Sequence, residues 1–297
     1  MTQDQIASEI GYSRPSISRL LNQARKAGIV RVIVSHPLER LIHLEDNLSK
    51  LLPLKLVRVT DPGTTNSIEA IGHAGAELLI ETTRDGQVIA MGNGRSVSST
   101  AQHVPPIPRN RSTIVQLLGS IPGGKPEFGI DSPTICHHVA QQLGATSARM
   151  SVPLFVDNPA LRIPLMREER VATTMALAAR AHVAVVGIAG VETKPNEGNV
   201  LSEYLTPDFL DAVDKGHAVG HILYHMYDAS GNFVTTPLAD RTIALSLDEL
   251  RNIPLVIGVA AGSQKVNAII AAIRGSIVNC LVTDVETARE IIARLRK

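Results

Sequence analysis

The sequence has only two cysteines, Cys136 and Cys280, and no tryptophan among its 297 residues. Two cysteines are too few for a disulfide scaffold or for a structural zinc site built on cysteine. Phenylalanine and tyrosine together make up 3% of the chain. This scarcity argues against a stacking platform for single-stranded nucleic acid, which needs several exposed aromatic rings.

Long apolar runs are also missing. None approaches the ~18 residues that a membrane span requires, and the N-terminus is polar instead of following the charged-then-apolar pattern of a secretory signal. We therefore expect a cytoplasmic protein that does not enter a membrane. With 44% hydrophobic and 19% charged residues, the composition is that of an ordinary soluble protein. The length predicts a small head followed by a domain with a substantial core.

The head, residues 1–35, predicts two short helices and a strand. Thr2 is a good N-cap for the first helix and Gly11 is a good stop, because glycine tolerates the left-handed conformation at a helix end. A second helix starts at Ser13 with Pro15 in its first turn. Its buried stripe is expected to be Ile17, Leu20, Leu21 and Ala24. The outward face is expected to carry Arg14, Ser16, Ser18, Arg19, Asn22, Arg25 and Lys26, which suits a DNA major groove.

Charge supports this helix-turn-helix interpretation. Residues 1–35 carry five cationic and two acidic side chains, a net charge of +3, whereas the whole chain is +1. Positive charge gathered in one small segment is typical of a module that contacts phosphates. Helix-turn-helix domains usually have a helix before this pair, and here Met1 directly precedes it. We therefore expect a truncated head, through either an upstream start or an incomplete DNA module.

Residues 36–52 are expected to form a linker helix, since leucines recur at 3- and 4-residue spacing after His36 and Pro37. Burial of the same helix on its own domain is an equally good interpretation. Residues 53–297 then alternate short β-branched runs with helical stretches. The expected strands are 56–59, 87–91, 113–118, 182–188, 255–259 and 278–282. The expected helices are 67–83, 97–104, 134–143, 168–181, 207–215, 265–274 and 286–295. This alternation predicts an α/β domain with a largely parallel sheet covered on both faces.

Small-residue turns follow several of these strands. Gly92, Asn93, Gly94, Arg95 and Ser96 lead from one strand into a helix, where backbone amides and the helix dipole would hold an anionic group such as a phosphate. Gly119 ends another strand, and a further turn reaches Lys265 at a helix start. Ligands of parallel sheets bind at such carboxyl ends. The sequence therefore predicts a shared crevice for a small anionic ligand, and no cofactor.

The same strand ends also allow a catalytic interpretation. A sugar isomerase or deaminase needs a carboxylate base, for which Asp131, Asp240 and Asp284 are candidates. Asp240 is expected in a turn and Asp284 at a helix N-cap. A metal site is not expected. Glycines argue against a helix that would align His217, His221 and His225, and this stretch predicts a hairpin, where His221 and His225 on one strand would share a face.

Taken together, these segments resemble the SorC family of bacterial transcriptional regulators over essentially the whole chain. The resemblance is carried by TQDQIASEIGYSRPSISRLLNQARKAGIVRV, MGNGRS, AHVAVVGIAGV, GHAVGHILYHMYDASG and the long segment from Arg241 to Ala288. It implies a Rossmann-like sensor domain of the phosphosugar isomerase and deaminase type that acts as a receptor. It also implies a homo-tetramer or dimer.

The resemblance implies roles for individual residues. The phosphate would lie at residues 92–96, and Lys265 would meet the effector, with Gly119 and His221 completing the predicted effector set. On the DNA side, Thr2 and Gln3 would approach the backbone, and Ser13, Arg14, Ser16, Ser18 and Arg19 would face the groove. His221 stands where many members have an aspartate, and Pro133 where many have asparagine. Neutral imidazole offers one donor and one acceptor, so the hydroxyl pattern of the ligand is expected to differ.

The resulting hypothesis is a DNA-binding regulator of carbohydrate or polyol catabolism, controlled by a small phosphorylated sugar or polyol, and not an enzyme. The alternatives are a phosphosugar isomerase or deaminase with an appended helix pair, and a sensor with an incomplete head that mixes into oligomers of a full-length paralogue. Whether it activates or represses depends on the position of its operator.

Overall fold

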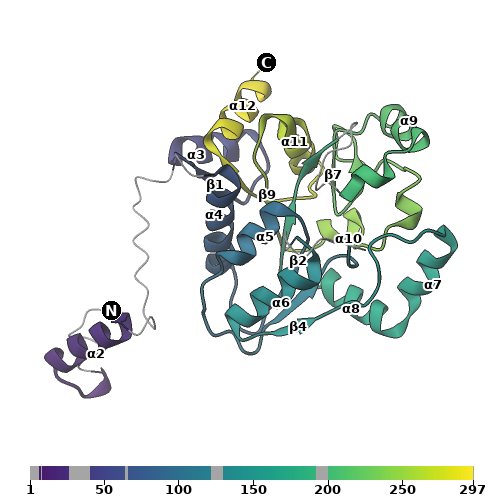
Figure 1. The fold of residues 1–297 in the computed structure, drawn as a ribbon. Coiled ribbons are helices and arrows are strands. Elements are labelled where there is room, and N and C mark those ends of the chain that lie inside the picture. Colours follow the sequence, from purple (N-terminus) through teal and green to yellow (C-terminus); the bar gives the residue numbers. More distant parts are fainter. Residues whose placement is uncertain are drawn as a thin grey trace. The chain divides into compact units, whose positions relative to one another are not determined.

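The computed structural model describes residue 7 and residues 9–26, 41–63, 66–121, 130–191 and 200–296 (Figure 1). The chain forms two compact units, Met1–Glu39 and Arg40–Lys297. Within the described residues, no helix has both the length and the apolar character needed to cross a membrane.

The smaller unit holds helical residues on both sides of Gly11. Gly11 has a φ of +70°, and the amide of Tyr12 donates to the carbonyl of Ala7, so the predicted helix stop is confirmed. Helix α2 runs Arg14–Lys26, and the amide of Ser16 donates to the Ser13 hydroxyl ahead of it. Ile17 is 3% exposed, as predicted, but Leu20 is 49% exposed, so its assignment to the buried stripe is wrong. The side chains of Leu21 and Ala24 lie outside the described residues.

The larger unit is built on a seven-stranded sheet in the order β1-β10-β9-β5-β2-β3-β4. Every neighbouring pair of strands in it is parallel. The strands are β1 (Leu56–Thr60), β2 (Val88–Met91), β3 (Thr113–Gln116), β4 (Thr146–Ala148), β5 (Val183–Gly187), β9 (Leu255–Val259) and β10 (Cys280–Asp284). The expected parallel α/β architecture is confirmed, although the short edge strand β4 was not predicted.

Helices cover both faces of this sheet, because alternate strand residues enter two different cores. Val183 and Val185 of β5 join one core, and Ala184 and Val186 join the other. The first core is covered by α4 (Ser67–Thr82), α5 (Arg95–Gln102) and α6 (Ser132–Leu143). The second is covered by α3 (Ile42–Leu51), α8 (Glu169–Ala179), α11 (Val266–Arg274) and α12 (Val285–Leu295) (Figure 1). Cys136 and Cys280 are free and buried in the first core.

Helix α3 belongs to the larger unit. Leu48 and Leu52 are buried in its core, and the Glu45 carboxylate accepts a hydrogen bond of 2.9 Å from the amide of Val59 in β1. The leucines of this segment therefore pack on their own domain, one of the two roles considered for them. Residues 36–40 of the expected linker lie outside the described residues.

A second, three-stranded sheet adjoins the carboxyl ends of the first. It consists of β6 (Ala189–Gly190), β7 (Gly220–Ile222) and β8 (His225–Tyr227), paired antiparallel. The hairpin of β7 and β8 turns at Leu223 and Tyr224, which have φ values of 51° and 65°. His221 and His225 therefore lie on different strands, and the expectation that one strand places them on a shared face is wrong. His225 pairs with Ile222, so His221 points to the opposite face.

The remaining elements are short. They are α7 (Arg162–Arg167), α9 (Pro207–Lys215), α10 (Leu247–Arg251) and the 3₁₀ turns η3 (Pro159–Leu161), η4 (Val200–Tyr204), η5 (Ala239–Arg241) and η6 (Ser263–Lys265). Of these, η6 positions the candidate site, because it lies between the end of β9 and the start of α11.

Candidate functional site

The chain order reverses between β2 and β5, which lie side by side in the sheet. From β2 the chain continues to β3 on one side, and from β5 it continues to β9 on the other. At such a switch point the connecting segments diverge and leave a crevice at the carboxyl ends of the strands. The Gly92–Ser96 turn follows β2, and Gly187, Ala189 and Gly190 lie at the end of β5 and in β6.

The turn from β2 into α5 is held by backbone hydrogen bonds. The amide of Gly92 donates to Val185 at 2.9 Å, and the amide of Gly94 donates to Ile130 at 3.0 Å. Gly94 is the N-cap residue and has a φ of 98°, a conformation that favours glycine. The amide of Ser98 is bonded to Gly94, while the amides before it in α5 have no intrahelical acceptor. This turn therefore has the geometry expected of an anion site.

Asn93 is fixed against the hairpin of β7 and β8. Its side-chain amide donates a 2.9 Å hydrogen bond to the hydroxyl of Tyr224. The Tyr224 ring is 8% exposed and stacks on the ring of His221, with the centroids 5.4 Å apart and the planes inclined by 22°. Burial raises the pKa of Tyr224 to about 12, so its hydroxyl stays protonated at neutral pH. The contact joins residues 131 positions apart.

His221 and Lys265 come together beside this pair. Burial of the imidazole lowers the pKa of His221 to about 4, and the positive charge of Lys265 lowers it further, with a smaller contribution from His225. His221 is therefore neutral at physiological pH. Lys265 ends η6 after β9, and it is half-buried. The structure thus brings Asn93, His221 and Lys265 of the predicted effector set together at the carboxyl ends of the strands.

Tyr224 was not predicted from the sequence. Its place at the crevice depends on two successive residues, Leu223 and Tyr224, in the left-handed region. Neither residue type signals such a turn, because glycine, asparagine and aspartate are the usual occupants. Tyr224 also contacts Phe155, with ring centroids 5.2 Å apart and the planes at 83°.

The carboxylates considered for catalysis are separated. Asp131 precedes α6, its carboxylate accepts from the amide of Ile121 at 2.9 Å, and burial raises its pKa. The negative charge of Asp131 also raises the pKa of Tyr224, so Asp131 lies near the crevice. Asp284 caps α12 by accepting from the amide of Thr287, and Asp240 lies in η5, so the structural roles expected for both are confirmed. Among the described residues, no group of three or more histidine, cysteine, aspartate or glutamate side chains could hold a metal ion.

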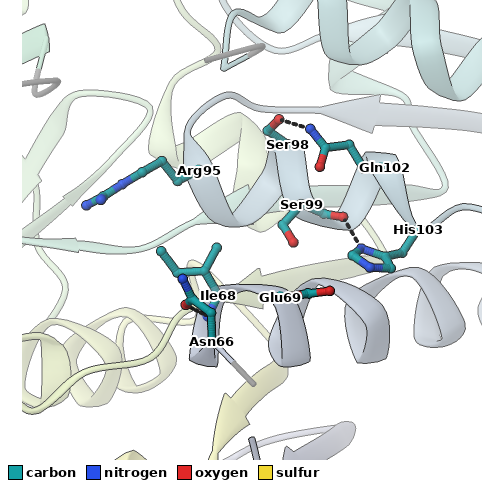
Figure 2. Close-up of a pocket in the computed structure, with 8 residues that line it drawn as sticks. All are labelled: Asn66, Ile68, Glu69, Arg95, Ser98, Ser99, Gln102 and His103. Carbon is teal, nitrogen blue, oxygen red and sulfur yellow. Dashed lines mark hydrogen bonds between the residues drawn. The ribbon is translucent and has the colours of Figure 1, made fainter. Parts of the chain in front are cut away.

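Gly119 and Arg95 also belong to the predicted effector set, but in the structure they have neighbours other than Asn93, His221 and Lys265. The amide of Gly119 donates to Ile243, and an added Cβ atom there would clash with the carbonyl group of Pro153, so close packing accounts for this glycine. Arg95 is exposed and lines a groove of about 460 Å³ between α4 and α5 (Figure 2). The other lining residues are Asn66, Ile68, Glu69, Ser98, Ser99, Gln102 and His103.

The predicted DNA-contacting residues lie in the smaller unit. Ser13, Arg14 and Arg19 are exposed, and Ser16 and Ser18 are half-buried. Ser13 and Ser16 also join their hydroxyls in a 2.8 Å hydrogen bond. Thr2 and Gln3 lie outside the described residues.

A doubly wound α/β domain whose switch-point turns carry hydrogen-bond donors, in a chain that also has a small helical unit, is the architecture of a ligand-binding protein. Comparison with known proteins agrees. The family model described as "Putative sugar-binding domain" matches residues 36–293. The chain belongs to the SorC family of bacterial transcriptional regulators.

Its relatives are named as regulators. The sorbitol operon regulator of Klebsiella pneumoniae is 30% identical, with 98% of this chain and 93% of that protein covered. Its full-length crystal structure aligns with a TM-score of 0.80 over 98% of this chain and 94% of that one. The transcriptional regulator LsrR of Enterobacter sp. (strain 638) is 32% identical, with coverages of 99% and 88%. The erythritol catabolism regulatory protein EryD of Brucella abortus (strain 2308) is 28% identical, with coverages of 99% and 92%.

Proposed function

We propose that this protein regulates transcription of genes for carbohydrate or polyol catabolism and that a small phosphorylated sugar or polyol controls it from the β2–β5 crevice. The observation that carries this proposal is the convergence of the α5 turn, Asn93, His221 and Lys265 at one switch point. The phosphate would bind the turn at residues 92–96, because the first amides of α5 and the helix dipole favour an anion there. Relatives named for sorbitol and erythritol support a sugar or polyol as ligand.

The output would be operator binding by the head. Ser13, Arg14, Ser16, Ser18 and Arg19 of the second helix and its cap would face the major groove, with Thr2 and Gln3 near the DNA backbone. A homo-tetramer or dimer would place heads on inverted half-sites of the operator. Control requires that the effector bind two arrangements of the oligomer with different affinity, and ordinary allosteric couplings are about 1–3 kcal/mol.

A fluorescence anisotropy titration with DNA from upstream of the protein's own gene tests this function. We expect affinity to fall as salt rises and to change by about fivefold or more when a panel of sugar and polyol phosphates includes the effector. Binding that is absent, or insensitive to salt, would count against a regulatory role. A variant of Asn93, N93A, should keep DNA binding and lose the response, because Asn93 fixes the crevice and lies in the larger unit.

The proposal treats the crevice as a receptor site and not a catalytic one. Asp131 is the carboxylate that could serve as a base there, since burial raises its pKa. Turnover of sugar phosphates by the purified protein, lost in D131N, would identify an enzyme instead. We expect no turnover in either protein.

A further inference from the structure

The ring of Tyr224 has aromatic neighbours from two parts of the chain. Besides stacking on His221, it meets the ring of Phe155 almost at right angles, with the centroids 5.2 Å apart and the planes at 83°. Phe155 in turn packs against Tyr204, with the centroids 4.5 Å apart and the planes inclined by 56°. Tilted and edge-to-face pairs at these separations are favourable. Phe155 therefore joins the ring of Tyr224 to that of Tyr204.

Phe155 is itself fixed in place. It is 5% exposed, and its backbone pairs with Thr242 in an antiparallel bridge. The amide of the next residue, Val156, donates to the carbonyl of Arg241 at 2.9 Å, and its carbonyl accepts from the Arg241 guanidinium at 2.8 Å. That guanidinium also lies 5.9 Å from the centroid of the Tyr204 ring. Close packing of this kind leaves the Phe155 ring little freedom to move.

Tyr224 needs support because its backbone conformation is unfavourable. Leu223 and Tyr224 form the hairpin turn with φ values of 51° and 65°, a region that residues other than glycine occupy where surrounding contacts impose it. If the turn relaxed, the Tyr224 hydroxyl would leave the side-chain amide of Asn93, which donates to it at 2.9 Å. His221 belongs to the same hairpin and would move with it. Phe155 lies outside the hairpin, so its ring can oppose that movement.

We propose that Phe155 is a positioning residue for effector binding. Its ring holds the Tyr224 hydroxyl where Asn93 can bond to it, and Asn93 lies in the α5 turn to which the phosphate is assigned. Tyr204 supports the Phe155 ring in turn. This inference rests on the proposed function and adds to it a residue that acts on the ligand through two others. Such a residue raises affinity by fixing the site before the ligand arrives.

The side-chain amide of Asn93 gives a readout that needs no ligand. Its nitrogen–proton signal in nuclear magnetic resonance spectra of the full chain is identified by its loss in N93A, and its position reports the hydrogen bond to Tyr224. Y224F removes the accepting hydroxyl and gives the signal of the broken bond. We expect F155L, which keeps an apolar side chain but removes the ring, to move the signal towards the Y224F position. Y204L should move it in the same direction by less.

A double-mutant cycle on affinity tests the link to the ligand. Calorimetric titrations use sorbitol 6-phosphate, erythritol 4-phosphate and inorganic phosphate, which the α5 turn should bind whatever the sugar. We expect F155L and Y224F each to weaken binding of a sugar phosphate by about fivefold, the usual effect of losing one hydrogen bond. The double variant should also be weakened by about fivefold, because both changes break the same bond. Two independent effects would multiply to about 25-fold.

Phe233 provides the matched control. F233L makes the same chemical change on a ring that is 47% exposed and contacts His225. It should change neither the Asn93 signal nor the affinities. Should F155L fail to fold, Y204L carries the same test, because it removes the ring that packs against Phe155 and leaves Phe155 in place.

The outcomes separate the two proposals. An Asn93 signal that stays at the parental position in F155L, or a loss of about 25-fold in the double variant, would overturn the positioning role and leave the receptor site intact. Failure of every probe to bind, together with absent operator binding, would reject the proposed function and, with it, any role of Phe155 in effector binding.

Discussion

At the scale of single residues, the two hairpin histidines show how burial sets protonation. His225 is 5% exposed, and its Nε2 donates to the carbonyl of Leu245 at 3.1 Å. Burial lowers its pKa to about 4, with Arg162 lowering it further, while the hydrogen bond to Leu245 and the charge of Glu249 oppose the shift. Both His221 and His225 must therefore gain a proton when the protein unfolds in mild acid.

The lowered pKa of His225 predicts that the free energy of unfolding depends on pH. Because the pKa of His225 is below its unfolded value of about 6.5, the unfolded chain binds more protons between pH 6.5 and 4. Stability is full above this window and falls as pH drops through it, by up to about 3 kcal/mol for His225 alone. Urea unfolding of H225Q at pH 7 and pH 4 should show a smaller fall than the parent chain. H217Q changes an exposed histidine and should lose as much unfolding free energy between pH 7 and pH 4 as the parent chain does. An equal loss in all three proteins would contradict the role given to His225.

At the scale of elements, Asp284 joins the starts of two helices. Its carboxylate accepts from the amide of Thr287 in the first turn of α12 at 2.8 Å. It also accepts from the hydroxyl of Ser67, the first residue of α4, at 2.5 Å. The side chain is buried at the end of β10, so water cannot replace these bonds.

Removing this cap should destabilise the protein. We expect D284A to lower the free energy of unfolding by about 2 kcal/mol, since a lost cap costs about 1 kcal/mol and a buried donor is left unpaired. D284N keeps one acceptor oxygen and should lose less. D248A serves as the control, because Asp248 is exposed and its ion pair with Arg251 lies at the surface. Chemical denaturation would contradict the role of Asp284 if D284A and D248A unfolded alike.

Elements with strong periodicity could be predicted from the sequence. Helix α9 has the expected bounds, and so does β9, because apolar spacing and flanking breakers mark both ends. The hairpin turn could not be placed, since Leu223 and Tyr224 adopt a conformation that their side chains disfavour and tertiary contacts impose.

Asn93 and Lys265 could be predicted for the site because strand ends in a parallel sheet converge. Tyr224 could not be predicted for the site, because its position depends on the left-handed conformation that it shares with Leu223.

At the scale of the whole molecule, cationic charge is concentrated at one end of the sequence. Residues 1–35 carry a net +3 in a chain of +1. Arg19 lies exposed on α2, on the face expected to meet DNA. A groove-facing arginine that reads a guanine contributes to specificity and not only to general attraction.

Arg19 therefore offers a test of sequence reading. We expect R19A to weaken operator binding by about tenfold or more, and to weaken binding to unrelated DNA much less. R180A removes an exposed arginine from the larger unit and should leave both affinities unchanged. Anisotropy titrations on both DNAs distinguish the outcomes. An equal loss on operator and unrelated DNA would assign Arg19 to the phosphates instead.

Helix α3 is the element through which, along the chain, a conformational change in the larger unit would be transmitted to the head. It is the first described element after the head, and Glu45 bonds it to β1 at the edge of the sheet. Two strands, β10 and β9, stand between that edge and β5, where the crevice begins. A ligand at the crevice cannot pull directly on α3. Within one chain, a shorter route to α3 runs through α12, which packs against both η6 and α3, so a displacement of Lys265 in η6 would reach the segment that leads to the head by way of this helix.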